Sequence, residues 1–198
     1  MKLVLIRHGA TDWSITGQHT GITNIPLNRL GLQQAHHTAK IAKQLLGKSF
    51  KTAIIYTSPL QRAIVTAEIV TGLSQELFRV TSDLLEFNYG DYEGLTPDEI
   101  RRSNPNWDIW RDGCPGGEIP EQVGLRVKSF IKIVEKHDEL VIAFAHGHLF
   151  RILGACAVGL GPQNGEIFTL DPATLSIIED VRGKRVIKLW NFDPKLVL

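Results

Sequence analysis

Two histidines, His8 and His146, each follow a short apolar run and precede a glycine. The runs span residues 2–6 and 140–145, and apolar runs of this length are typical of buried parallel strands. Ligands of open α/β sheets bind beyond the carboxyl ends of the strands. We therefore expect both histidines to lie at one ligand site.

Two arginines occupy similar positions. Arg7 precedes His8, and Arg62 falls in the first turn of the helix expected after a third apolar run, residues 53–56. A lone arginine or histidine at a strand end more often has a structural role. Two histidines and two arginines at strand ends that converge on one place instead favour a catalytic role. Guanidinium forks match phosphate oxygens, and phosphoryl transfer depends mainly on positioning and positive donors. His146, near a helix N-terminus, would add a third donor, which leaves His8 as an uncharged nucleophile.

Cleavage of a phosphate ester also needs a general acid, because the departing alkoxide must be protonated. Glu86, within the Leu-Leu-Glu-Phe sequence of residues 84–87, is the candidate. We expect it at the end of a strand, beside the same ligand site.

Apolar β-rich runs alternate with amphipathic stretches along the chain, a pattern typical of a sheet covered by helices on both faces. The sequence thus predicts an α/β fold, a three-layer sandwich with a mostly parallel central sheet, in one domain over residues 1–198. Asn28 and Gly47 are expected to begin and end the first long helix, and Thr96 to open a capping box. Helices are expected at residues 29–46, 60–73, 97–103, 120–137 and 149–158, strands at 2–6, 53–56, 78–80, 140–145, 166–170, 175–179 and 186–190, and irregular chain at 107–118.

The composition excludes several classes of function. Hydrophobic residues make up 43 % and charged residues 22 % of the 198 residues, with a formal net charge of +1. This balance gives no electrostatic case for a nucleic acid or an anionic membrane as partner. No apolar stretch approaches the roughly 20 residues of a membrane span, and the first residues lack the pattern of a signal peptide. The two cysteines, Cys114 and Cys156, fit neither a disulfide framework nor a metal site, so we expect a cytoplasmic location.

Three segments, residues 5–11, 58–67 and 145–147, resemble the signatures of the histidine phosphatase superfamily, which includes the cofactor-dependent phosphoglycerate mutases. Their order and spacing agree over the whole chain. The resemblance implies a phosphoglycerate mutase-like fold, no cofactor, and a small phosphate ester as the molecule bound. It also implies His8 as the nucleophile, Arg7, Arg62 and His146 as the phosphate pocket, and Glu86 as the proton donor.

The resemblance extends to the loop after the first signature. Ser14 stands where relatives often carry an asparagine that contacts phosphate, and Thr20 with Gly21 matches their small loop over the substrate. These three residues are therefore expected to contact the phosphate or the substrate.

The region after Glu86 resembles the phosphatase branch of the superfamily. The mutases carry an arginine directly after the acid and a long basic insertion, whereas this chain has Phe87 and a short connection. Residues 17–21, 89–94, 110–114 and 144–148 also resemble the fungal sugar bisphosphatases of the superfamily. We therefore expect hydrolysis of a small sugar phosphate or bisphosphate, with substrate contacts from Tyr89, His148 and, for a second phosphate, Arg111.

Other interpretations stay open at this point. The chain could be a phosphoglycerate mutase, or a non-catalytic module that binds phosphorylated ligands, although it keeps all five residues expected to act. Arg111 could instead form a surface ion pair, and Trp107 and Trp110 could be core aromatics or a wall around the substrate. His146 and His148 form a His-x-His pair, but no carboxylate-rich ligand set accompanies them, so no metal is expected. A homodimer is left open.

Overall fold

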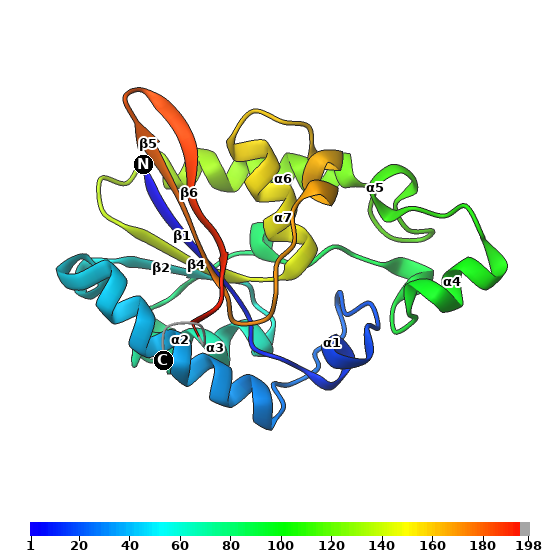
Figure 1. Cartoon of the computed structure of the whole chain (residues 1–198), viewed down its shortest axis with the longest axis horizontal. Helices are drawn as coiled ribbons and strands as arrows, with labels where there is room; N and C mark the ends of the chain where they lie inside the picture. Colours follow the sequence, from blue (N-terminus) through cyan, green and yellow to red (C-terminus); the bar gives the residue numbers. More distant parts are fainter. Residues whose placement is uncertain (195–198) are drawn as a thin grey trace.

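A single six-stranded sheet, of order β3-β2-β4-β1-β5-β6, forms the centre of the protein (Figure 1). The computed structural model describes residues 1–194. The strands are β1 (Lys2–Arg7), β2 (Ile54–Thr57), β3 (Arg79–Val80), β4 (Val141–Ala145), β5 (Leu175–Val181) and β6 (Lys184–Phe192). β1 to β4 run parallel, while β5 pairs antiparallel with β1 and with β6. The prediction of a mostly parallel α/β sheet is confirmed.

Helices cover both faces of this sheet. α2 (Arg29–Leu46) and α3 (Gln61–Thr71) lie on one face, and α6 (Pro120–Val134) and α7 (Gly147–Ala157) lie on the other (Figure 1). Successive side chains of a strand point to opposite faces. In β1, Val4 and Ile6 pack in the core beneath α2 and α3, whereas Leu3 and Leu5 pack in the core beneath α6 and α7. The chain therefore folds into the expected three layers.

Local signals set the helix ends. Asn28 Oδ1 accepts a hydrogen bond from the Gly31 N–H at 2.9 Å, and Gly47 follows the last residue of α2. Thr96 and Glu99 form the predicted capping box at the start of α4 (Pro97–Ser103). Both predictions are confirmed, because these caps depend on residues only a few positions apart.

Several segments differ from the expectation. The loop after β1 contains a short helix, α1 (Asp12–Thr16), and the segment expected to be irregular contains another, α5 (Ile109–Asp112). Residues 166–170 were expected to form a strand, which is wrong, because the 3₁₀ helix η5 (Pro162–Ile167) includes the first two of them and the other three lie in irregular chain. The remaining 3₁₀ helices are η1 (Gly47–Thr52), η2 (Gln75–Leu77), η3 (Ser82–Leu84) and η4 (Gly90–Tyr92). Glu86 follows η3 and does not end a strand.

The carboxyl ends of β1, β2 and β4 meet at one edge of the sheet. The His8 N–H donates to the Ala145 carbonyl at 2.9 Å, and the Ser58 N–H donates to the Phe144 carbonyl at 3.0 Å. The ladder thus continues just past the strands and fixes the residues that follow them. Within residues 1–194, no helix is both long and apolar enough to cross a membrane.

Candidate active site

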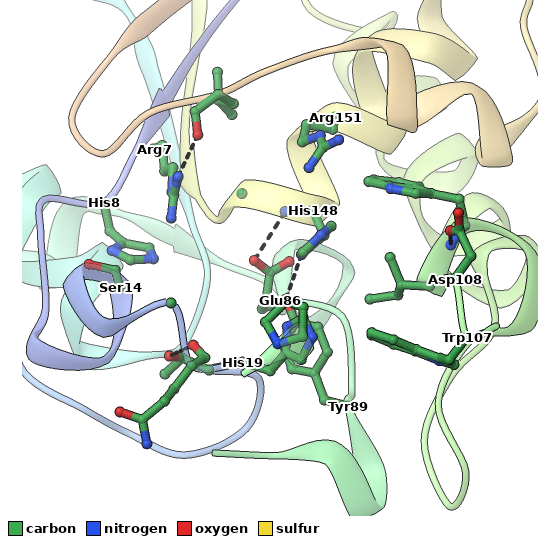
Figure 2. A pocket seen from close by; sticks show the side chains of 18 of the residues that line it. Arg7, His8, Ser14, His19, Glu86, Tyr89, Trp107, Asp108, His148 and Arg151 are labelled. Atoms are coloured by element: carbon green, nitrogen blue, oxygen red, sulfur yellow. Dashed lines mark hydrogen bonds between the residues drawn. The ribbon is translucent and has the colours of Figure 1, made fainter. Parts of the chain in front are cut away.

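A cavity of about 420 Å³ opens at these strand ends (Figure 2). It is bordered by residues from β1 and the loop after it, from the loop after η3, and from α4, α5 and α7. Its lining includes Arg7, His8, Ser14, His19, Thr20, Glu86, Tyr89, Arg101, Trp107, Trp110, His148 and Arg151. The cavity has His8 on one side and aromatic side chains on the other.

His8 presents a free ring nitrogen at this cavity. Its Nδ1 lies 2.7 Å from the carbonyl oxygen of Gly9, and because a carbonyl only accepts, Nδ1 carries the hydrogen. Nε2 therefore keeps its lone pair. Burial, followed by the positive charges of Arg62 and Arg7, holds the pKa of His8 well below its usual value. The ring is thus neutral at neutral pH, as a nitrogen nucleophile must be.

Arg7 lies beside His8 with a donor that the protein does not use. Its Nη1 donates to the carbonyl of Leu170, but the buried Nε has no hydrogen-bond partner among the described residues. The guanidinium rests on Gly147, where a Cβ atom would lie only 3.2 Å from the Arg7 Cζ. A buried N–H group without an acceptor lowers the stability of the folded protein, and a bound ligand can remove this cost by supplying the acceptor. Arg7 is therefore suited to an anion.

Arg62 and His146 lie together behind His8. Both are fully buried, Arg62 Nε lies 3.2 Å from His146 Nδ1, and the His146 ring centroid lies 5.2 Å from that of His8. Since His146 Nδ1 accepts from Arg62, its hydrogen is on Nε2, 2.8 Å from the hydroxyl of Ser58. Neither Arg62 nor His146 is among the described residues that line the cavity. The structure thus brings both to the site, with their donors directed at protein acceptors.

The loop expected over the substrate is held by Arg62 and Glu93. Arg62 donates to the carbonyls of Thr20, Gly21 and Thr23 at 2.8–3.0 Å, and the Glu93 carboxylate accepts from the N–H groups of Gly21 and Thr23. Thr20 lines the cavity, whereas Gly21 is not among the described lining residues. Gly21 packs against the carbonyl of Phe87, where a Cβ would lie 2.6 Å away.

Ser14 lines the cavity near His8 (Figure 2), but its hydroxyl belongs to the cap of α1. Ser14 Oγ accepts from the Thr11 N–H and lies 2.8 Å from the Thr11 carbonyl, to which it donates. A phosphate contact from Ser14 would compete with these local bonds.

Glu86 points into the cavity from below the N-terminus of α7 (Figure 2). Its Oε1 accepts from the N–H groups of Phe87 and Leu149 at 2.9 Å, and its Oε2 accepts from the His148 N–H at 3.2 Å. The carboxylate thus satisfies two of the free N–H groups at the start of α7. The carboxyl group is held in one place, on the same cavity as His8.

Aromatic side chains form the wall opposite His8. The hydroxyl of Tyr89 lies 2.7 Å from His148 Nδ1, and the Tyr89 ring stacks on His19 with centroids 4.4 Å apart. Trp107 meets His19 edge-on, and the Trp110 ring lies 5.1 Å from that of His148. Trp107 is buried, and both tryptophans line the cavity, so each belongs to the wall.

Arg111 lies outside this cavity, contrary to its expected role with a second phosphate. Its side chain is 64 % exposed and pairs with Asp112 at 2.7 Å, which is the surface ion pair considered as the alternative. Arg151 of α7 lines the cavity instead, and its guanidinium lies 4.3 Å from the centroid of the Trp110 ring. Arg151 was not predicted from the sequence. Its spacing of three residues from His148 could have indicated it, because residues three apart on a helix share a face.

The histidines of the site do not form a metal-binding set. Nδ1 of His148 contacts Tyr89, and both ring nitrogens of His146 have protein partners. No group of three histidine, cysteine, aspartate or glutamate residues within 1–194 could hold a metal ion.

Comparison with known proteins shows the family of this chain. A sequence model of the histidine phosphatase superfamily (branch 1) matches residues 3–193. The chain belongs to this superfamily. The resemblance inferred from the three signatures is confirmed, and the histidine phosphatase fold positions His8, Arg62 and His146 at neighbouring strand ends.

Three relatives illustrate the range of the family. The chain is 37 % identical to an acid phosphatase of Mycobacterium tuberculosis over 93 % of this chain and 89 % of the relative. It is 38 % identical to the sedoheptulose 1,7-bisphosphatase of Saccharomyces cerevisiae over 82 % of this chain and 69 % of the relative. A 2,3-bisphosphoglycerate-dependent phosphoglycerate mutase of Brucella anthropi is 35 % identical over 81 % of this chain and 83 % of the relative.

Among solved structures, the product of an open reading frame of Mycobacterium tuberculosis superimposes with a TM-score of 0.90. It is 34 % identical, and the match covers 98 % of each chain. Family membership and the named phosphatases identify the chain as a phosphoric monoester hydrolase.

Proposed function

We propose that the protein hydrolyses a small sugar phosphate or bisphosphate through a phosphohistidine formed on His8. The observation that carries the proposal is the position of His8 and Arg7 side by side in the lining of one cavity (Figure 2). The lone pair of His8 Nε2 is free to attack, and the buried Nε–H of Arg7 beside it lacks a protein acceptor. Phosphoryl transfer requires a nucleophile that attacks phosphorus and a nearby positive group that binds the phosphoryl oxygens, and His8 and Arg7 meet these two requirements.

The reaction has two steps. In the first, His8 Nε2 attacks phosphorus, the bond to the ester oxygen breaks, and the leaving alkoxide takes a proton from Glu86. In the second, water attacks the phosphorus of phosphohistidine and the P–N bond breaks. The Glu86 carboxylate takes the proton from that water, and His8 recovers its lone pair. Charge that develops on the phosphoryl oxygens is stabilised by Arg7.

The far side of the cavity supports a sugar as the substrate. Trp107, Trp110 and Tyr89 line this side with aromatic side chains, and His148 offers a hydrogen-bonding ring nitrogen. Arg151, stacked on Trp110, supplies a positive charge at the wall away from His8, where a second phosphate would lie (Figure 2). The likeness to a sedoheptulose 1,7-bisphosphatase agrees with this class of substrate.

The likeness to phosphoglycerate mutases makes the transfer of a phosphoryl group between substrate positions the second candidate function. Phe87, which follows Glu86, is fully buried and stacks on Tyr89, so no arginine at this position reaches over the cavity. Without such a cation, nothing at this position grips the carboxylate of a phosphoglycerate, and water has access to the phosphohistidine. We therefore favour hydrolysis.

The decisive experiment traps the intermediate. The enzyme is mixed with a phosphorus-labelled sugar bisphosphate and quenched in base, and the label is then mapped. Acid-labile, base-stable label on His8, with loss of turnover in His8→Asn, supports the proposal. His36→Asn, a change of an exposed histidine on α2, serves as the control. Turnover by His8→Asn at the rate of the unchanged enzyme would overturn it. Interconversion of 2- and 3-phosphoglycerate with little release of phosphate would assign the mutase instead.

A further inference from the structure

The segment that carries Glu86 belongs to no strand or α-helix. It runs from the end of η3 at Leu84 to the start of η4 at Gly90, in the loop between two short 3₁₀ helices. A loop of this kind lacks the ladder of hydrogen bonds that fixes His8 beside β4. Proton transfer nevertheless requires the carboxyl group to stay within hydrogen-bond reach of the leaving oxygen. The backbone of this segment must therefore be held by other groups.

Arg126 of α6 supplies those bonds. Its Nη1 donates to the carbonyls of Asp83 and Leu85 at 3.2 and 2.5 Å, and its Nη2 donates to the carbonyl of Glu86 itself at 3.0 Å. One guanidinium thus binds three carbonyls along the chain that leads to the acid. Neither Arg126 nor its partner Glu118 is among the described residues that line the cavity.

Glu118 fixes the orientation of this guanidinium. Its two carboxylate oxygens accept from Nε and Nη2 of Arg126, each at 3.0 Å. Its Oε2 also accepts from the N–H of Asn88 at 2.8 Å, on the other side of Glu86. The side chains of Arg126 and Glu118 are only 17 % and 21 % exposed, so solvent screens the pair weakly. The pair therefore grips the loop on both sides of the acid.

We infer that Arg126, oriented by Glu118, is a positioning residue for the proton donor Glu86. The inference rests on the proposed role of Glu86 as the general acid. The backbone of Glu86 is tied to α6 through Arg126, while its carboxylate is tied to the N-terminus of α7 through Leu149 and His148. The acid thus has one fixed point at each end of the residue. Loss of the bond between Arg126 and the Glu86 backbone is expected to shift the carboxyl group that delivers the proton, while the positions of His8 and Arg7 stay the same.

The test compares two leaving groups, since a good leaving group needs little protonation. Turnover of an alkyl phosphate and of p-nitrophenyl phosphate is measured for Arg126→Met, Arg126→Lys, Glu86→Gln and the double variant Arg126→Met/Glu86→Gln. Arg126→Met is expected to lower kcat for the alkyl ester by roughly tenfold or more, the scale on which misplaced catalytic groups act, with a much smaller loss for the aryl ester. In the Glu86→Gln background the same change is expected to add little, because both changes remove one function.

Arg126→Lys separates geometry from charge. Lysine keeps the charge but lacks the planar fork that binds carbonyls and a carboxylate together, so we expect it to resemble Arg126→Met. Glu118→Gln, which retains one acceptor oxygen, provides a milder change in case Arg126→Met fails to fold, and it should show the same selective loss. Arg185→Met is the control, because Arg185 is likewise held in ion pairs, with Glu135 and Asp180, but lies on β6. It should leave both substrates unaffected.

The outcomes are distinguishable. A selective alkyl loss in Glu86→Gln combined with equal alkyl and aryl losses, or none, in Arg126→Met and Glu118→Gln would overturn the positioning role alone. Full activity of Arg126→Lys would also overturn it, because the charge would then suffice. Equal alkyl and aryl losses in Glu86→Gln itself would overturn the acid role and, with it, this inference.

Discussion

The hydroxyl of Tyr89 lies 2.7 Å from Nδ1 of His148, and this contact decides which hydrogen His148 offers to a ligand. Burial raises the pKa of Tyr89 well above its usual value, so the phenol keeps its proton and donates it to Nδ1. The hydrogen of the neutral His148 ring is then on Nε2. A substrate hydroxyl or phosphate oxygen therefore meets a donor at this wall.

Tyr89→Phe removes that control. Without the phenol, the two tautomers of His148 become competitive, and the substrate loses part of a hydrogen bond worth about 1 kcal/mol, or roughly fivefold in affinity. We expect KM for the preferred sugar phosphate to rise by up to that factor, with kcat for p-nitrophenyl phosphate nearly unchanged. Tyr92→Phe is the matched control, because Tyr92 packs edge-on against Trp107 away from His148. An unchanged KM in Tyr89→Phe would contradict this role.

Arg151 should decide any preference for a second phosphate. It is the guanidinium stacked on Trp110 in the cavity wall, whereas Arg111 is paired with Asp112 at the surface. Arg151→Met is expected to lower kcat/KM for a sugar bisphosphate by roughly tenfold or more, the value of one charge-assisted hydrogen bond. Turnover of p-nitrophenyl phosphate should be retained. Arg111→Met should behave as the unchanged protein, and a loss of bisphosphate preference there would refute this assignment.

Activity should not depend on a metal ion. Arg7 supplies positive charge beside His8, and the ring nitrogens of His146 are used by Arg62 and Ser58. We expect full turnover after treatment with EDTA and dialysis, measured with p-nitrophenyl phosphate and with a sugar phosphate. Activity that disappears on chelation and returns with zinc or magnesium would contradict the proposed two-step histidine mechanism.

Acid should destabilise the fold through its buried histidines. Burial and the charge of Arg101 lower the pKa of His19 to about 4. Between pH 6.5 and about 4 the unfolded chain binds a proton on His19 that the folded chain does not, so the free energy of unfolding falls as the pH drops. The pKa values of His8, His146 and His148 are lowered too, which steepens the decline.

His19→Gln isolates one of these groups. In urea unfolding across this pH range, the slope of stability against pH should become shallower by about 1.4 kcal/mol per pH unit, the value for one proton. The exposed His36 provides the control, and His36→Gln should keep the original slope. An unchanged slope in His19→Gln would show that His19 does not remain neutral in the folded protein.

Arg7, His8 and His146 could be placed from the sequence because each lies at or next to a strand end, whereas Glu86 lies in a loop between two 3₁₀ helices. His8 and His146 follow directly after β1 and β4, so their convergence depends only on strand order and the parallel ladder. The caps at Asn28 and Thr96 were predictable for a similar reason, since each involves residues three apart.

Features that depend on tertiary contacts were not predictable in this way. The alternation in residues 166–170 resembles a strand, but Gly165 packs so closely on Trp110 that a Cβ would lie 2.6 Å from the ring. The exposed position of Arg111 depends on α5, a helix of only four residues that its neighbour Asp108 caps. The hold of Arg126 on Glu86 joins segments 40 residues apart.

Arg62 already donates four hydrogen bonds within the protein, from Nε to His146 and from Nη1 and Nη2 to the carbonyls of Thr20, Gly21 and Thr23. Most bonds between an inorganic phosphate ion and Arg62 would replace bonds that Arg62 already makes, so the net gain in free energy from Arg62 is expected to be small. The free ion is therefore held mainly by Arg7. We therefore expect only weak inhibition by product phosphate, so that turnover continues while phosphate accumulates around the enzyme.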